Sequence, residues 1–195
     1  MKFDWSPNGH CDSSSLTPKP NFRTYVKKPW NLPDLPVYSL MTECDGRINM
    51  NICTYVSAMS MSPKRYAIGV YYNTKTLENI QKGGKMVLQL LAQNQWPVVR
   101  NFGQKSGMGF DKHDFLSRKN KGDTEHPHKQ PYACIRWHEH VVLRHALAYV
   151  ELETVWHQSA GDHELYLFDV NRHTTNKQEN PLMISHLREN GLVRI

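Results

Sequence analysis

Short runs of apolar and branched residues, separated by turn residues, follow one another along most of the chain. This pattern predicts strands at 37–42, 47–53, 66–72, 86–92, 146–156 and 164–170. Asp45-Gly46 lies between the first two strands and Gly161-Asp162 between the last two, and such turns join neighbouring antiparallel strands into hairpins. The strand at 86–92 is apolar at nearly every position, so we expect it to be buried on both faces.

Helical segments are few and short. One is expected after the capping side chains of residues 73–76, one over 95–102 with Asn94 as its cap, and one from Pro181 to just before Gly191. A parallel doubly wound sheet needs a helix between nearly every pair of strands. The pattern therefore favours a mainly β protein built as an antiparallel barrel.

Two stretches show neither a strand pattern nor a helix pattern. Residues 1–36 hold six prolines and several aromatic side chains, so we expect an extended arm that lies on an apolar surface, ahead of a single domain over 37–195. Residues 104–130 mix Gly, Lys, Asp and His with little apolar content. We expect a long mobile loop there, of the kind that covers a site.

Composition limits the class of protein. The 195 residues are 39% hydrophobic and 22% charged, which suits a soluble globular domain better than a disordered or membrane-spanning chain. The net charge of +6 is modest, and the small basic clusters lack the aromatic platform of a nucleic-acid binder, so no nucleic-acid partner is predicted. No stretch approaches 18 apolar residues, so no membrane partner is predicted either. Four widely spaced cysteines and the absence of an export-like N-terminus predict reduced thiols and a cytoplasmic location.

Seven short motifs occur in one order along residues 45–163. They are Asp45-Gly46, Asn49, Ser60-Met61-Ser62-Pro63, residues 75–80 (KTLENI), Ser106-Gly107 with Asp111-Lys112, residues 146–151 (ALAYVE) and Gly161-Asp162-His163. Each motif alone is weak, but their joint order and spacing resemble the flavin reductase family that uses the FMN-binding split barrel.

This resemblance implies a fold and an activity. The fold is a six-stranded antiparallel Greek-key split barrel with a few short helices, forming a homodimer that holds FMN, or FAD, at the subunit interface. The activity is hydride transfer from NADH or NADPH to flavin, with the reduced flavin supplied to an oxygenase partner. The alternative is an FMN-binding electron-transfer or flavin-carrier protein that no nicotinamide reduces.

Candidate cofactor-binding residues gather in two regions that wrap the flavin in the family. They are Asn51, Cys53, Thr54, Tyr55, Ser57, Lys64, Asn73, Lys75, Thr76 and Asn79. Hydroxyls, amides and cations suit a flavin phosphate, because hydrogen bonds to an oxyanion are stronger when charge assists them. Lys64 stands where the family often has a second proline, which is a departure from its pattern.

His163 is the candidate catalytic residue. It follows Gly161-Asp162 at an expected hairpin tip, and the resemblance places it near the flavin on the nicotinamide side. Hydride transfer between two ring systems depends on their alignment more than on an acid or base. We therefore expect no catalytic triad.

Histidines and one cysteine form a competing group. On a strand, Cys134, His138 and His140 would share one face, and a cysteine with two histidines can hold a metal ion. Arg136 would stand among them on that face, and the spacing fixes no fourth ligand. We therefore predict a solvated edge strand and no metal.

Overall fold

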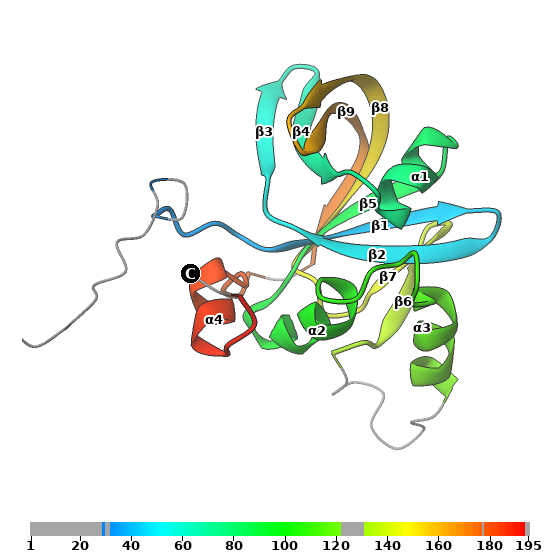
Figure 1. Cartoon of the computed structure of the whole chain (residues 1–195), viewed down its shortest axis with the longest axis vertical. Helices are drawn as coiled ribbons and strands as arrows, with labels where there is room; N and C mark the ends of the chain where they lie inside the picture. Colours follow the sequence, from blue (N-terminus) through cyan, green and yellow to red (C-terminus); the bar gives the residue numbers. More distant parts are fainter. Residues whose placement is uncertain (1–28, 30–31, 122–130, 177, 194–195) are drawn as a thin grey trace, which may run out of the picture.

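A curled antiparallel sheet forms most of the molecule. The computed structural model describes Pro29 and residues 32–121, 131–176 and 178–193. The strands are β1 (Tyr38–Cys44), β2 (Arg47–Cys53), β3 (Val56–Met61), β4 (Lys64–Tyr71), β5 (Lys85–Leu90), β6 (Cys134–Trp137), β7 (His140–Leu143), β8 (Ala148–Ala160) and β9 (His163–Thr175). The helices are α1 (Lys75–Gln81), the 3₁₀ helix η2 (Gln93–Val98), α2 (Val99–Phe102), α3 (Lys112–Lys121) and α4 (Ile184–Glu189). Figure 1 shows α1 on one side of β1 and β2, with α2, α3 and α4 on the other.

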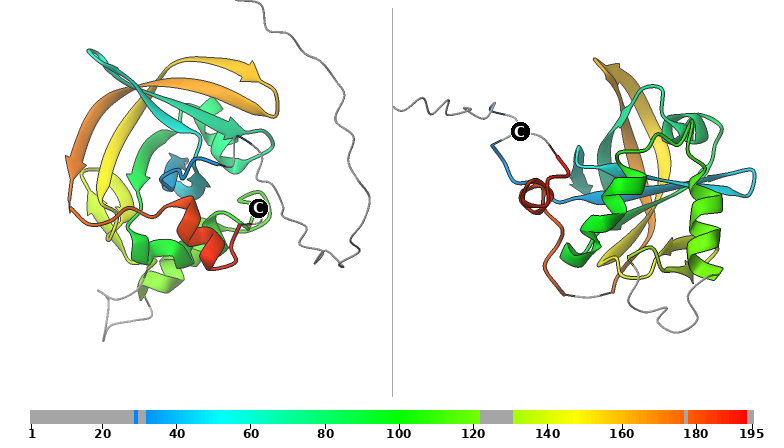
Figure 2. Two further views of the ribbon diagram at one scale, coloured as in Figure 1. Left: turned by 90° about the vertical axis from the view of Figure 1, so that its left-hand side faces the viewer. Right: turned by 60° about the horizontal axis from the view of Figure 1, so that its bottom comes forward.

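The main sheet has seven strands where six were expected. Their order is β2-β1-β5-β8-β9-β4-β3, every neighbouring pair is antiparallel, and the sheet curls around one of its faces (Figure 2). The strand missing from the prediction is β3, which mixes serines, methionines and an alanine without a clear alternation and is mostly exposed. The mainly β, antiparallel class with a few short helices is confirmed. No helix in the described part of the chain is long and apolar enough to span a membrane.

Both expected hairpin turns are present. Asp45 and Gly46 have φ angles of 52° and 70° and turn β1 into β2, which pair from Cys44 opposite Arg47. Gly161, with φ of 74°, turns β8 into β9. A positive φ costs glycine nothing and asparagine or aspartate little, so the residues of these turns are sufficient to determine them.

The hairpin of β6 and β7 corrects one expectation. His138, with φ of 51°, lies in the turn between the two strands, so Cys134 pairs opposite Leu143 while Trp137 pairs opposite His140. His140 thus shares its face with Trp137, and Cys134, three residues before Trp137, points to the opposite face. The shared face that would have joined them in a metal site does not exist.

Helix α1 begins as predicted, but two other helix starts do not. The Thr74 hydroxyl caps α1 by accepting a hydrogen bond from the Leu77 amide at 3.3 Å. Ala92, not Asn94, precedes η2, and α4 begins after Met183 instead of at Pro181. Pro181 forms an isolated bridge with Ala92 and Leu182 donates to the Leu91 carbonyl at 2.8 Å, so this segment extends the sheet before it can turn into a helix.

The expected loop over 104–130 contains helix α3. Leu116 is buried against the core, and the Lys112 side chain is only 4% exposed, with its Nζ donating to the carbonyls of Met50 at 2.7 Å and Phe102 at 2.8 Å. Leu116, the partly buried Phe115 and one buried lysine hold the helix, and this mixed set forms no clear amphipathic period, which is why the sequence did not reveal it. Residues 122–130 lie outside the described residues.

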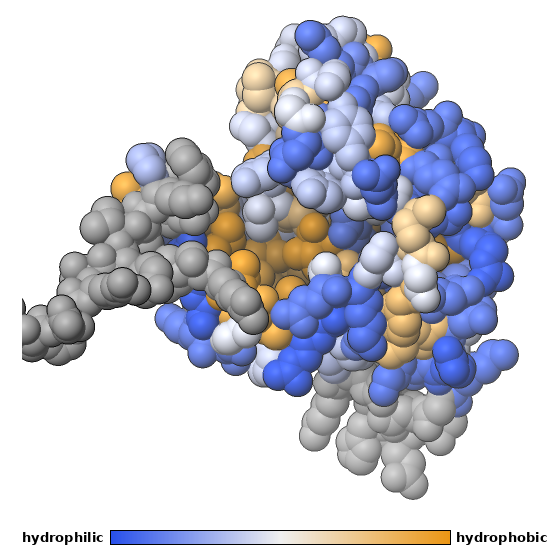
Figure 3. Space-filling model, viewed as in Figure 1, coloured by the Kyte–Doolittle hydropathy of each residue, from blue (hydrophilic) through white to orange (hydrophobic). Residues whose placement is uncertain are grey.

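Two hydrophobic cores lie on the two faces of β1 and β5. The core inside the curl joins the sheet to α1 and includes Leu40, Ile68, Leu77, Ile80, Met86, Leu88, Leu152, Tyr166 and Phe168. The other joins the sheet to α2, α3 and α4 and includes Met41, Met50, Val87, Val99, Phe102, Leu116, Leu143 and Leu187. Neighbouring residues such as Val87 and Leu88 enter different cores, which confirms that this strand is buried on both faces. In Figure 3 apolar side chains also line a hollow between β3 and helices α2 and α4.

The end of the expected arm is bound to the domain. The Leu35 carbonyl accepts from the Ile184 amide at 3.0 Å, and the Asp34 carboxylate accepts from the amide and hydroxyl of Ser185. Residues 34–36 therefore close against the start of α4. Residues 1–28, 30 and 31 lie outside the described residues, so the extended arm stays a prediction.

The buried Lys112 gives a testable pH dependence. Burial lowers the pKa of Lys112 from 10.5 to about 8. Between these values the unfolded chain holds the proton that the folded chain has lost, so Lys112 makes a contribution that raises the free energy of unfolding as pH increases from 8 to 10.5. Urea unfolding across this range should show the rise in the wild type.

The variant Lys112→Met lacks this rise and leaves the Met50 and Phe102 carbonyls without the lysine hydrogen bonds, which should cost about 1–3 kcal/mol. The matched control is Lys121→Met on the exposed surface of the same helix, which should change stability by less than about 0.5 kcal/mol. Parallel pH profiles for wild type and Lys112→Met would contradict the assignment.

Candidate functional site

Three rings from distant parts of the chain meet at one end of the sheet. Tyr55 lies in the link between β2 and β3, Tyr71 ends β4, and His163 begins β9 directly opposite Tyr71. The His163 ring centroid is 5.2 Å from that of Tyr55 and 5.0 Å from that of Tyr71, both with edge-to-face geometry. Both tyrosines are more than half exposed, so the group, named here the ring cluster, presents aromatic surface to solvent.

Gly69 makes this approach possible. Its amide donates to the Tyr55 carbonyl at 2.9 Å, and a Cβ atom at this position would lie 3.3 Å from Tyr55 Cβ and 3.6 Å from His163 Cδ2. A side chain here would press against two members of the ring cluster. The glycine thus holds the link after β2 close to β4.

The His163 imidazole is oriented by its neighbour in the chain. Its Nδ1 lies 2.6 Å from a carboxylate oxygen of Asp162, and the side chain is 21% exposed. An ionised carboxylate only accepts hydrogen bonds, so Nδ1 carries the proton. In the neutral ring, Nε2 is left as an acceptor.

A cavity of about 290 Å³, lined by both polar and apolar surface, adjoins the ring cluster. Its lining joins the ends of β2 and β4 and the start of α1 to residues 103–107, and consists of Asn49, Asn51, Tyr71, Tyr72, Asn73, Thr74, Lys75, Thr76, Gly103, Gln104, Lys105, Ser106, Gly107 and Lys112. Four predicted cofactor-binding residues, at 51, 73, 75 and 76, therefore share one cavity. Tyr71 belongs to both the cavity and the ring cluster and so connects the two.

A second cavity, of about 300 Å³, lies on the other side of Gly107. Asn49, Lys75, Gly107 and Lys112 line both cavities. A Cβ atom on Gly107 would overlap the Asn49 side-chain oxygen and lie 2.9 Å from Lys75 Cβ. The backbone at Gly107 therefore forms the wall between the two cavities.

Two of the predicted residues have buried side chains that hold α1 in place. Thr76 is 1% exposed and its hydroxyl accepts from Asn49 Nδ2 at 3.0 Å, while Asn79 is 2% exposed and its Nδ2 donates to the Thr42 hydroxyl at 3.0 Å. The side-chain oxygen Oδ1 of Asn79 has no hydrogen-bond partner among the described residues. In this structure both side chains face the sheet.

The remaining predicted residues lie apart from the shared cavity. Lys64 is 2.9 Å from His173 Nε2 and lines an apolar cavity of about 250 Å³ between the β3–β4 hairpin and β8–β9. Ser57 is exposed on β3. Thr54 lies beside Tyr55 in the link, and Cys53 packs against the inner core, where burial raises the pKa of its thiol to about 12. The Cys53 thiol is therefore not a nucleophile at neutral pH.

A family model and several solved structures match this arrangement. The model of the flavin reductase like domain matches residues 35–190. The chain belongs to this family. No curated protein matches it significantly.

The solved structures of flavin reductase proteins share the fold at low identity. The NADH:FAD oxidoreductase of Streptomyces globisporus has a TM-score of 0.65 at 15% identity, covering 88% of this chain and 93% of its own. The styrene monooxygenase flavin reductase of Pseudomonas putida has a TM-score of 0.60 at 19% identity, covering 78% and 86%. Flavoredoxin from Methanosarcina acetivorans has a TM-score of 0.60 at 14% identity, covering 85% and 77%.

The residues at the site fit the flavin that gives this flavin reductase family its name. A flavin carries an apolar ring system at one end and a phosphate at the other. The ring cluster offers exposed aromatic surface, and the cavity beside it offers amides from Asn51 and Asn73 and the Lys75 ammonium group, which also pairs with Glu78 at 3.0 Å. Lys105, which lies 4.5 Å over the Phe110 ring, adds a second cation at the cavity wall.

Sequence reasoning missed Tyr71, Lys105 and Lys112. The pattern predicts Tyr71 in a strand and assigns it no role, and it predicts a loop over the two lysines. The motifs Ser106-Gly107 and Asp111-Lys112 were the available signal, because they stand in the flavin reductase order on both sides of the cavity wall.

Gly107 allows a direct test of the cavity wall. Gly107→Ala should destabilise the fold by about 1–3 kcal/mol, because the added methyl group pushes on Asn49 and through it on the buried bond to Thr76. Gly109→Ala is the matched control, since a Cβ atom there meets nothing within 4 Å. Denaturant unfolding of both variants measures the difference, and equal stabilities would contradict the close approach.

Proposed function

We propose that the protein is a flavin reductase that transfers hydride from NADH or NADPH to FMN. The observation that carries the proposal is the ring cluster of Tyr55, Tyr71 and His163, with a cavity directly beside it that Asn73 and Lys75 help to line. The flavin ring would lie against the cluster, and its phosphate would extend toward Asn73 and Lys75. Membership of the flavin reductase family supports the same assignment.

His163 would contact the nicotinamide or the flavin ring. When bound, flavin supplies the chemistry by accepting hydride from the reduced nicotinamide. The contribution of the chain is alignment, since Asp162 fixes the imidazole and the rings of Tyr55 and Tyr71 meet it edge-to-face. The protein needs no charged acid or base at this point.

FMN is the proposed flavin, and FAD is the alternative. A cavity of about 290 Å³ suits the ribityl phosphate of FMN, whereas FAD would also need the second cavity beyond Gly107.

The three cysteines in the described residues are free, which supports the proposed cytoplasmic location.

Anaerobic reduction of bound flavin tests the proposal. Protein mixed with FMN or FAD should bind one of them, and NADH or NADPH should then bleach its visible absorption. His163→Gln should keep flavin binding but slow bleaching by about tenfold to a hundredfold, because alignment is lost. The matched control is His157→Gln on β8, which lies outside the ring cluster and the adjoining cavity and should leave the rate unchanged.

Two results would contradict this assignment. If neither flavin changes the melting temperature or its own fluorescence with the protein, the flavin site is wrong. If flavin binds but stays oxidised under an anaerobic excess of both coenzymes, the protein is a flavin carrier or electron-transfer protein and not a reductase.

A homodimer with flavin near its interface forms part of the proposal, as does an oxygenase partner that receives reduced flavin. Strand β3 is one edge of the sheet and exposes Met59 by 60% and Met61 by 84%, continuing the apolar surface of Tyr55. An exposed apolar edge beside the ring cluster is suited to a second copy of the chain. The styrene monooxygenase flavin reductase among the related structures supports an oxygenase as the acceptor.

Charge on this edge tests the dimer. The double variant Met59→Lys with Met61→Lys should sediment as a monomer and bind flavin more weakly, because two lysines oppose burial of the edge. Met108→Lys, at a methionine that is 61% exposed elsewhere, should keep the wild-type sedimentation. A wild-type monomer with full flavin affinity would remove the dimer from the proposal.

A further inference from the structure

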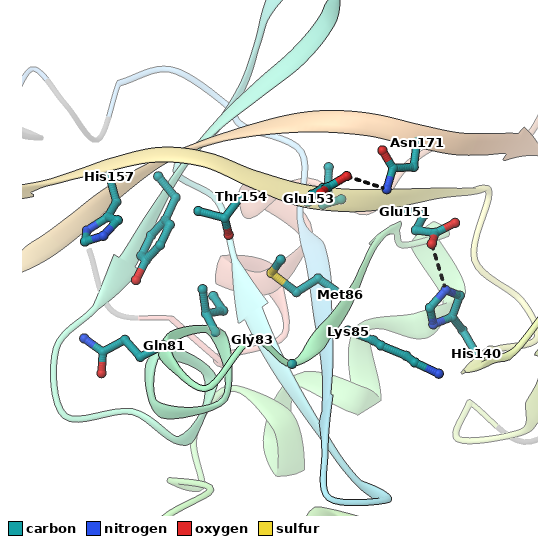
Figure 4. A pocket seen from close by; sticks show the side chains of 14 residues that line it. Gln81, Gly83, Lys85, Met86, His140, Glu151, Glu153, Thr154, His157 and Asn171 are labelled. Carbon is teal, nitrogen blue, oxygen red and sulfur yellow. Dashed lines mark hydrogen bonds and ion pairs between the residues drawn. The ribbon is translucent and has the colours of Figure 1, made fainter.

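A cavity that shares no lining residue with the flavin site lies on the other side of α1. It has a volume of about 530 Å³ and is bounded by the end of α1, the start of β5 and the strands β8 and β9. Figure 4 shows His140 and Glu151 side by side at one end of this cavity, with His157 at the other. Its polar rim is unrelated to any step of flavin reduction.

His140 is the unusual side chain in this rim. It begins β7, is 1% exposed, and neither of its ring nitrogens has a hydrogen-bond partner among the described residues. Its Nε2 lies 3.5 Å from Glu151 Oε1 and 3.8 Å from Glu139 Oε1, which is too far for good hydrogen bonds but aims the nitrogen at both carboxylates. A buried imidazole that makes no close hydrogen bond is costly, so a ligand that approaches its nitrogen more closely than these carboxylates would stabilise it.

The spacing of the three groups matches a metal site. One atom from each of Glu139, His140 and Glu151 lies within 4.8 Å of the other two. Ligand atoms about 2.0–2.2 Å from a tetrahedral zinc ion are separated by roughly 3.5 Å, close to both distances from His140 Nε2. One imidazole and two carboxylates also form a donor set that zinc accepts.

Arg172 competes for the same carboxylates. From the neighbouring strand β9 it forms ion pairs with Glu139 and Glu151, and its side chain is 42% exposed. A divalent cation and a guanidinium cannot both occupy this position, because like charges at such distances repel strongly. Exposure leaves Arg172 free to turn toward solvent when the cation binds.

We propose that Glu139, His140 and Glu151 form a binding site for a divalent transition metal ion such as Zn²⁺, with Arg172 as the side chain that the ion displaces. The histidine supplies a neutral nitrogen and the two glutamates supply the compensating charge. Three protein ligands leave a coordination position for water or another small ligand, on the side of the cavity. The site is independent of the proposed flavin chemistry.

Titration with Co²⁺ and Zn²⁺ tests the site. The full chain should bind one Co²⁺ at this site with visible absorption bands, and Zn²⁺ should displace the Co²⁺ and raise the melting temperature. Arg172→Gln should tighten binding by about tenfold or more, because a competing cation has been removed. His140→Gln should lose both the bands and the Zn²⁺-dependent rise.

His157→Gln is the matched control, because this histidine lines the same cavity at the other end of the view in Figure 4. It should bind Co²⁺ like the wild type. If His140→Gln binds as tightly as the wild type, or if Arg172→Gln shows no saturable binding, the proposal is overturned. Flavin titration of the same variants should be unchanged, which separates failure of the metal site from failure of the flavin site.

Discussion

Two buried hydrogen bonds between amide and hydroxyl side chains fix α1 against the sheet, and the proposed flavin site depends on them. The bonds join Asn49 to Thr76 and Asn79 to Thr42, and all four residues are at most 5% exposed. Separating either pair without water would leave buried polar groups unpaired, so α1 cannot rotate or slide. Lys75 is therefore held beside the wall between the two cavities. The backbone of residues 106–108 can pass the Asn49 side chain only because residue 107 is a glycine.

The sequence predicted features that are determined locally and missed those that depend on distant contacts. The turns at Asp45-Gly46 and Gly161 and the Thr74 cap need only their neighbours, and they were found. Helix α3 depends on Lys112 reaching the carbonyls of Met50, which is distant in the sequence, and of Phe102, and Pro181 starts no helix because it bridges to Ala92. The site divides in the same way. Tyr55 and His163 were named, but the strand register that brings Tyr71 between the cavity and His163 could not be inferred.

Strand β9 connects the two proposed sites without coupling them closely. His163 stands at its first residue and Arg172 nine residues later. At about 3.3 Å per residue, the two positions are separated by roughly 30 Å along the strand. Side chains at such a distance share no contacts, so substitutions at one site should add to those at the other. Flavin binding can therefore be removed by substitution while metal binding serves as a test of folding, and the reverse also holds.

The bulge between Ala58 and Ser60 has a consequence for the solubility of the chain. An unpaired edge strand is a template on which other chains can add strands and aggregate. The bulge shifts the register of β3 against β4, which interrupts the regular row of amides and carbonyls along the edge. Long fibrous growth from β3 is thereby hindered, even though its methionines are exposed. An edge with this bulge is suited to a partner whose surface fits its shape, but not to the regular strand addition that amyloid requires.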